Sequence, residues 1–249
     1  MRHRWISWSA ALALVGGLAG GAQAVEITVT SGRDNTIYSD ADLSNGVGAH
    51  LFAGRSGSAG ALRTLRSVID FDLAGLLPSG AVVEDARLIL TQNTPRFRID
   101  GTVALHRLER AFGEGTSDAP MGEGGGTAST TGDATWTEAI LGTSSWTTPG
   151  GDFDPTASAQ ADVLGVTLEF SSASLVSDVQ AAVDGDALFF GWLLKLTDET
   201  LAAVRFGSFQ NPGEAARPQL VIEYSVIPEP GTAALVGLGL LGLAARRRR

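Results

Sequence analysis

The side chains of this sequence that can do chemistry are carboxylates and aromatic rings, because thiols are missing and histidines are few. The chain has no cysteine, which excludes disulfides, thiolate metal sites and cysteine nucleophiles. Outside the first 24 residues the only histidines are His50 and His106, and neither has a partner at metal-ligand spacing. No hydrolase elbow, zinc-protease motif or phosphate-binding loop occurs. The sequence therefore shows no catalytic constellation.

Several acidic residues stand in glycine-rich segments, where the backbone can fold around a cation. The oxygen-bearing side chains with this setting are Asp34, Asn35, Asp133, Asp152 and Asp154. Calcium takes about six to eight such oxygen ligands. We therefore predict a structural Ca²⁺ site with the four aspartates as candidate ligands. The alternative for each one is an aspartate that caps its own turn.

A second pair of carboxylates, Asp70 and Asp72, lies two residues apart on an expected strand. Their Cα atoms would be about 7 Å apart on one face, and paired carboxylates are what a glycosidase requires. The simpler interpretation is a solvated strand face or a turn cap.

Three aromatic residues outside the leader, Tyr38, Trp136 and Trp146, are expected in loops or at strand ends. Rings in such places can stack on sugars, so these three are our candidate carbohydrate-binding residues. Anchoring of the core is the alternative, because large aromatics provide much of the burial in a β-sandwich.

The elements that must position these residues are short strands. The 249 residues include 32 glycines and are 44% hydrophobic, which fits one globular domain with many turns. Period-two alternation and Gly/Pro turns predict an all-β jelly-roll sandwich. The expected strands are residues 25–30, 65–72, 86–92, 102–108, 163–170, 188–196, 203–209 and 219–224.

One short helix is expected after Ser172 or Ser174, either of which can cap it, and before Gly185. The apolar residues spaced one turn apart should face the sandwich: Leu175, Val179 and Val183. Asp178 and Gln180 should point outward. The Gly/Ser/Thr-rich stretch between Phe112 and Thr135 is predicted to be a long loop, functional or mobile.

The N-terminal 24 residues have the three parts of a signal peptide. A basic start precedes an apolar run over 10–19, and Ala22-Gln23-Ala24 gives an A-x-A cleavage signal. We expect export by the secretion machinery and cleavage after Ala24. The domain boundaries that follow are 1–24 for the leader, 25–226 for the sandwich and 227–249 for the tail.

The tail combines Pro228-Glu229-Pro230, an apolar run over 232–245 and four final arginines, Arg246, Arg247, Arg248 and Arg249. Fourteen helical residues cover about 21 Å, short of a hydrocarbon core of about 30 Å. The arginines should stay cytoplasmic, which leaves the domain outside. The tail resembles the PEP-CTERM sorting signal. That resemblance implies transient membrane insertion, processing by an exosortase-type enzyme, and a Gram-negative host that makes extracellular polysaccharide.

The expected mature domain is strongly acidic. Without the leader and the tail, 12 basic and 26 acidic residues remain, a net charge of −14. Such a domain should be repelled by nucleic acid and by anionic lipid.

Six segments of the domain, in order, resemble the DNRLRE-domain family. They are DNTIY (34–38), RSVIDFD (66–72), VALHRL (103–108), GDATW (132–136), WTTPGGDF (146–153) and RPQL (217–220). The resemblance implies a jelly roll related to carbohydrate-binding modules, some of which bind alginate. Relatives commonly have Trp where this sequence has Phe112.

Two functions follow as hypotheses. The first is an exported, surface-sorted protein without catalytic activity that binds or organises extracellular polysaccharide. The alternative is an exported hydrolase or lyase that degrades polysaccharide.

Overall fold

The structure is a computed structural model that describes residues 24–30, 32–39, 42–57, 62–92, 100–226 and the single residue Arg246. All of the predicted signal peptide except Ala24 lies outside the described residues, as do the motif Pro228-Glu229-Pro230 and Arg247, Arg248 and Arg249. Ala24–Ile227 forms one compact unit. Within the described part of the chain, no helix is long and apolar enough to cross a membrane.

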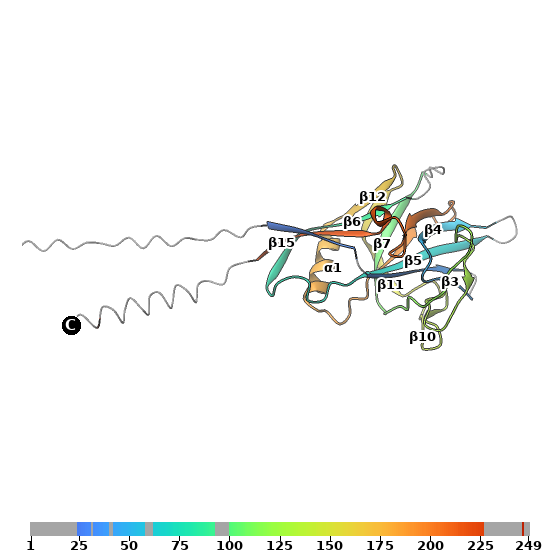
Figure 1. Cartoon of the computed structure of the whole chain (residues 1–249), viewed down its shortest axis with the longest axis horizontal. Helices are drawn as coiled ribbons and strands as arrows, with labels where there is room; N and C mark the ends of the chain where they lie inside the picture. Colours follow the sequence, from blue (N-terminus) through green and yellow to red (C-terminus); the bar gives the residue numbers. More distant parts are fainter. Residues whose placement is uncertain are drawn as a thin grey trace, which may run out of the picture. The chain divides into compact units, whose positions relative to one another are not determined.

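A four-stranded antiparallel sheet forms one layer of this unit (Figure 1). Its strand order is β1 (Ala24–Val29), β15 (Gln219–Val226), β6 (Ala81–Thr91) and β12 (Thr167–Ser171). Ala24 pairs with Ser225, so the chain enters and leaves this sheet on neighbouring strands at the same end. Along β6 buried and more exposed side chains alternate, as a sheet with one wet face requires.

A larger sheet forms the second layer. Its main path runs β11 (Phe153–Asp162), β7 (Thr102–Leu108), β13 (Trp192–Leu196), β5 (Arg63–Phe71), β2 (Gly32–Tyr38), β3 (Leu43–Asn45) and β8 (Thr127–Ala128). Strand β4 (His50–Ser56) pairs with β5, and β14 (Val204–Gly207) pairs with β4. Besides one α-helix, the remaining elements are the small β9 (Glu138–Ile140) and β10 (Ser144–Ser145) hairpin and the 3₁₀ helix η1 (Glu214–Ala216).

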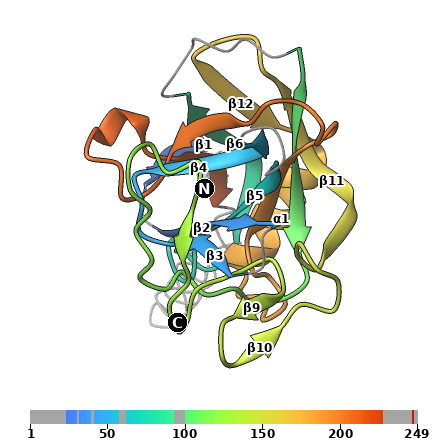
Figure 2. The same ribbon diagram turned by 90° about the vertical axis from the view of Figure 1, so that its right-hand side faces the viewer.

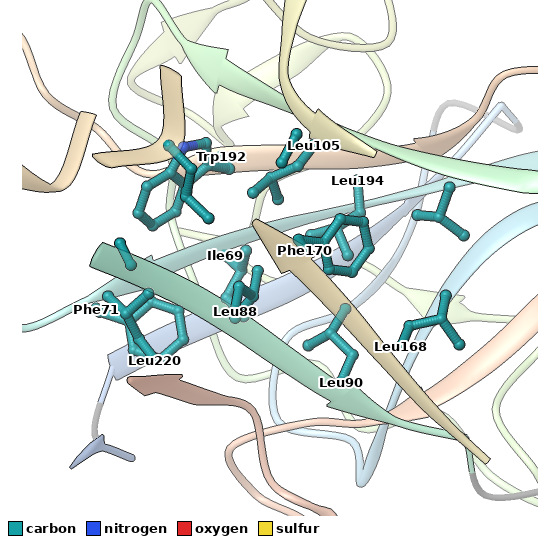
Figure 3. Close-up of a cluster of buried hydrophobic side chains, with 14 of the residues drawn as sticks. Ile69, Phe71, Leu88, Leu90, Leu105, Leu168, Phe170, Trp192, Leu194 and Leu220 are labelled. Atoms are coloured by element: carbon teal, nitrogen blue, oxygen red, sulfur yellow. The ribbon is translucent and has the colours of Figure 1, made fainter. Parts of the chain in front are cut away.

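The main hydrophobic core lies between the two sheets (Figure 3). Leu88 and Phe170 of the smaller sheet and Ile69, Leu105 and Trp192 of the larger one are all fully buried. Burial of each such side chain stabilises the fold by about 1.5–3 kcal/mol before entropy is counted. The prediction of an all-β sandwich is confirmed.

Helix α1 (Ala173–Val183) packs against β6 and β11. The Ser172 hydroxyl accepts a hydrogen bond from the Leu175 N–H at 3.0 Å, so Ser172 is the N-cap. Gly185 follows the helix with a φ of +80°, which confirms the predicted stop. The outward orientation predicted for Asp178 is wrong, because this carboxylate is buried.

Asp178 connects the helix to the larger sheet. One carboxylate oxygen accepts from Ser158 Oγ at 2.6 Å and from Trp192 Nε1 at 3.0 Å. The other receives Arg107 Nη1 at 3.5 Å. Gln180, also predicted to point outward, is half-buried and accepts from the Val83 N–H at 2.8 Å. Both polar residues therefore join the helix to strands.

The outer face of the larger sheet is partly covered by the chain between β7 and β11. Ile37, Val68 and Leu193 of the sheet form a second hydrophobic cluster with Phe112 and Trp146 of this covering segment. The β9 and β10 hairpin belongs to it and lies at the rim of the domain in the end-on view (Figure 2). Both faces of β2 and β5 are therefore buried over much of their length.

Candidate functional site

Three basic side chains lie in a row on that outer face. Leu194 of β13 and Ser67 of β5 pair across the two strands and face inward. Their neighbours Lys195 and Arg66 therefore point outward, because side chains alternate along a strand. Arg55 of β4 is exposed and pairs with a residue two positions before Arg66. Lys195 is the single lysine of the sequence. Positive charge thus gathers here in an otherwise acidic domain.

Arg66 is held in a fixed orientation by Glu199. Its Nε and Nη2 donate to the two carboxylate oxygens at 2.7 and 2.9 Å, and its Nη1 donates to the Gly150 carbonyl at 2.7 Å. Lys195 Nζ lies 3.6 Å from the same carboxylate. Burial would raise the pKa of Glu199, but hydrogen bonds and charges from Arg66 and Lys195 outweigh it and lower that pKa. Glu199 is therefore ionised at neutral pH and keeps both cations in place.

Two aromatic rings complete this surface. The Arg66 guanidinium lies 4.8 Å from the centre of the Trp136 ring and 5.6 Å from that of Phe153. Both rings are half-buried. Of the tryptophans in the described residues, Trp136 is the one that is not buried. We call Arg66, Lys195, Glu199, Trp136 and Phe153 the Arg66 surface.

The other two candidate sugar-stacking residues lie in the core. Tyr38 is fully buried and its hydroxyl donates to the Glu123 carbonyl at 2.8 Å. Burial, with the nearby Glu123 charge, raises the pKa of Tyr38. Trp146 is 5% exposed and its Nε1 donates to the Thr135 carbonyl at 2.9 Å. Neither ring has a free face for a sugar, so of the predicted three only Trp136 belongs to a surface.

A hollow of about 390 Å³ adjoins the Arg66 surface at Phe153. Asp152 lines it and accepts from Arg110 Nε at 3.0 Å and from the Thr147 and Thr148 N–H groups, each at 2.9 Å. Burial opposes these bonds, but together they lower the pKa of Asp152. A volume of this size falls in the range of small-molecule sites.

His106 lies behind Phe153, with ring centres 5.0 Å apart. Its Nδ1 is 2.8 Å from the Asp154 carbonyl, and burial lowers its pKa. The Asp154 side chain is exposed, and one of its oxygens accepts from the Thr156 N–H at 2.7 Å. His106 is thus a neutral side chain that fixes the start of β11.

The predicted calcium ligands lie in separate hydrogen-bond networks. Asp133 is fully buried and accepts from Ser117 N–H and from the N–H and hydroxyl of Thr130. Asp34 is also fully buried, and its Oδ2 accepts from the Phe209 N–H at 2.8 Å. In the described part of the chain, no three His, Cys, Asp or Glu side chains gather where they could hold a metal ion. A structural Ca²⁺ ion stays a prediction.

Asn35, which the sequence placed beside Asp34 as a possible ligand, instead joins three segments. Its Oδ1 accepts from Ser44 Oγ at 2.8 Å and from the Asn45 N–H at 3.1 Å. Its Nδ2 donates to the Glu114 carbonyl at 2.8 Å. The amide is buried and its polar atoms are used, which is a structural role.

A second hollow of about 660 Å³ lies beside the end of α1 and contains the predicted pair Asp70 and Asp72 with Asp186. Asp70 is half-buried, against the predicted solvated face, and pairs with Arg33 at 3.1 Å. Burial, only partly offset by Arg33, raises the pKa of Asp70. Hydrogen bonds from the Leu188 N–H and from Arg107 lower the pKa of Asp186.

The stretch between Phe112 and Thr135 lacks regular structure except for β8, as predicted, but it is anchored. Glu123 accepts from the His50 N–H at 2.8 Å and Asn45 Nδ2 at 3.0 Å, and contacts His50 Nδ1 at 3.0 Å. Its φ of +67° is strained for a residue with a side chain. Phe112 itself is buried, with Arg33 4.9 Å above its ring, so it does not reach the Arg66 surface.

Comparison with known proteins adds one finding. Residues 226–249 match the family model of the PEP-CTERM protein-sorting motif. This motif is recognised by exosortase, so the protein is exported and sorted to the cell envelope or the extracellular space. No curated protein matches the chain.

Proposed function

We propose that this exported, surface-sorted protein is a non-catalytic binder or organiser of extracellular polysaccharide. The observation that carries the proposal is the Arg66 surface. It combines half-buried Trp136 and Phe153 with Arg66 and the only lysine, Lys195. Aromatic faces pack on the apolar faces of sugar rings, while guanidinium and ammonium groups donate to hydroxyl and carboxylate oxygens.

The charge distribution indicates where an acidic polysaccharide would bind. A domain with a net charge of −14 repels a polyanion over most of its surface. Because Arg55, Arg66 and Lys195 lie on one sheet face, repulsion is weakest there. The resemblance to DNRLRE domains and the Gram-negative origin are further parts of the proposal, since alginate is among the ligands of such domains.

The test is binding of the full chain to immobilised acidic and neutral polysaccharides. Trp136→Ala and Lys195→Met should each weaken binding by about tenfold, the effect of losing roughly 1.4 kcal/mol of contact. Arg87→Gln, which removes one positive charge from the opposite sheet, is the matched control and should bind as wild type. Equal binding by all four proteins would reject the Arg66 surface as the site.

A second candidate function has its own supporting observation. Asp70 and Asp186 open into the same 660 Å³ hollow, and their pKa values are shifted in opposite directions. In a glycosidase, the carboxyl group with the raised pKa is the general acid, and the one with the lowered pKa is the base or nucleophile. We prefer the binding function because the Arg33 ion pair holds Asp70. Release of reducing ends or unsaturated products, lost in Asp70→Asn, would establish the enzyme instead.

The sorting part of the function is tested separately. Deleting residues 228–249 should release the protein to the medium or periplasm, because this removes the apolar run that can enter a membrane. Neutral replacement of all four final arginines should impair retention or processing. Unchanged fractionation with the envelope, judged by immunoblot, would reject this assignment.

A further inference from the structure

We propose that Asp34, Glu114 and Gln210 form a binding site for a divalent cation of the calcium class. The three side chains come from β2, from the covering segment and from the connection between β14 and η1. The proposal does not rest on glycan binding, and it concerns a different part of the larger sheet from the Arg66 surface.

Hydrogen bonds bring the three side chains together. Glu114 Oε1 accepts from Gln210 Nε2 at 2.7 Å and lies 3.4 Å from the Asp34 backbone nitrogen. Asp34 Oδ2 accepts from the N–H of Phe209, the residue before Gln210. The Asp34 carboxyl is thus oriented toward the same turn that supplies Gln210. The ladder between β2 and β3 covers only Thr36 and Ile37, so Asp34 lies where the edge of β2 is open.

Two buried side-chain oxygen atoms in this cluster accept no hydrogen bond. Within the described part of the chain, four buried side-chain nitrogen or oxygen atoms lack a hydrogen-bond partner. The two oxygens among them are Asp34 Oδ1 and Gln210 Oε1. A buried acceptor without a partner costs about 1–3 kcal/mol, and more for a charged group. Two such acceptors beside a second carboxylate therefore call for an electropositive group, which a cation would supply.

The donor atoms select the kind of cation. Two carboxylates and an amide carbonyl offer only hard oxygen ligands, which suit calcium, whereas zinc prefers nitrogen and sulfur. Calcium accepts the irregular geometry of ligands from three separate segments better than magnesium, which demands a near-ideal octahedron. Water would complete the shell, since Glu114 and Gln210 are only half-buried.

The predicted ligands Asp133 and Asp152 differ from Asp34 in this respect. Their carboxylate oxygens already accept hydrogen bonds from backbone N–H groups, Arg110 or Thr130. Of the four aspartates that the sequence suggested, Asp34 is thus the buried one with a free oxygen. Its partners Glu114 and Gln210 are 80 and 176 residues away in sequence, and no local spacing reveals them.

The experiment uses the full chain in mild detergent, first freed of metal with EDTA. Equilibrium dialysis against radioactive calcium should give one bound ion per chain. Saturating calcium should raise the melting temperature by about 5–10 °C, and magnesium by less. Asp34→Asn keeps an acceptor for the Phe209 N–H but removes the charge. We expect it and Glu114→Gln each to lower calcium affinity by about tenfold or more.

Asp154→Asn is the matched control, because it removes an exposed aspartate that was also a candidate ligand; it should bind calcium as wild type does. If Asp34→Asn does not fold, Glu114→Gln and Gln210→Ala decide, since both residues are half-buried and outside the main core. A wild-type protein that binds no calcium, or one whose affinity survives these substitutions, would overturn the proposal.

Discussion

The outer faces of the two sheets are built differently. On the smaller sheet, Arg87 of β6 pairs with Glu26 at 2.8 Å and Asp85 at 3.2 Å, and the three side chains are between 32% and 58% exposed. On the larger sheet, the covering segment turns the outer face into a second buried layer that contains Asn35, Asp133 and Phe112. Exposed ion pairs contribute little to stability, whereas buried polar groups must be paired. The polar chemistry of the molecule is therefore concentrated on one sheet.

This comparison predicts its largest effect at Asn35. Asn35→Ala removes the amide oxygen that accepts hydrogen bonds from the Ser44 hydroxyl and the Asn45 N–H. It also removes the amide nitrogen that donates to the Glu114 carbonyl. Leaving these groups unpaired in a buried place should lower the free energy of unfolding by about 3–5 kcal/mol. Urea denaturation of the full chain measures it. A loss below about 1 kcal/mol would show that the covering segment contributes little to the fold.

The next effect is expected where α1 meets the larger sheet. Asp178→Ala leaves Trp192 Nε1 and Ser158 Oγ without their acceptor and should cost about 2–4 kcal/mol. Asp178→Asn retains an acceptor oxygen and should cost less, which makes it the matched variant. If both substitutions lowered the free energy of unfolding as little as a substitution at an exposed helix position does, the buried role of Asp178 would be refuted.

The same contrast explains what the sequence could predict. Where one face of a strand is wet, as in β6, hydrophobic alternation survives and the strand is recognised. All eight expected strands overlap observed ones. Strand β2, buried on both faces with Asp34, Asn35 and Thr36 inside, has no such pattern and was missed as a strand. Strand β11 was missed because alanines and Pro155 replace its large apolar residues.

The candidate site could be predicted only in part. Trp136 was identified by residue type, because an aromatic ring near glycines is a sequence-level signal. Its partners Arg66, Lys195 and Glu199 belong to strands or turns far apart in the chain. Asp178 was misplaced because helical periodicity identifies the apolar stripe but not the polar residue whose carboxylate meets Trp192 across the core. Contacts between distant segments carry this information, and no local pattern encodes them.

We expect a smaller, pH-dependent effect on stability at Glu123. Burial would raise the pKa of Glu123, but hydrogen bonds from His50 and Asn45 and the His50 charge lower it below the ordinary 4.5. The stability that this carboxylate contributes is therefore present above that ordinary value and is lost as the pH falls through the lowered pKa. Glu123→Gln should cost about 1–2 kcal/mol at pH 7. Its stability should converge with that of wild type toward pH 3, whereas a constant difference would contradict the ionic role.

The smallest effect is predicted for Arg87→Gln on the smaller sheet. Its partners Glu26 and Asp85 are 58% and 40% exposed, so water can solvate each group once the pair is broken. Screening and side-chain entropy leave such a pair worth about 0–1 kcal/mol. We expect a loss below about 0.5 kcal/mol in low salt, and less at about 1 M salt, where charges are screened beyond about 3 Å. Denaturation of Arg87→Gln and Asn35→Ala side by side measures the contrast directly. A cost for Arg87→Gln comparable to that of Asn35→Ala would mean that the exposed face also stabilises the fold, and that the two outer faces differ only in appearance.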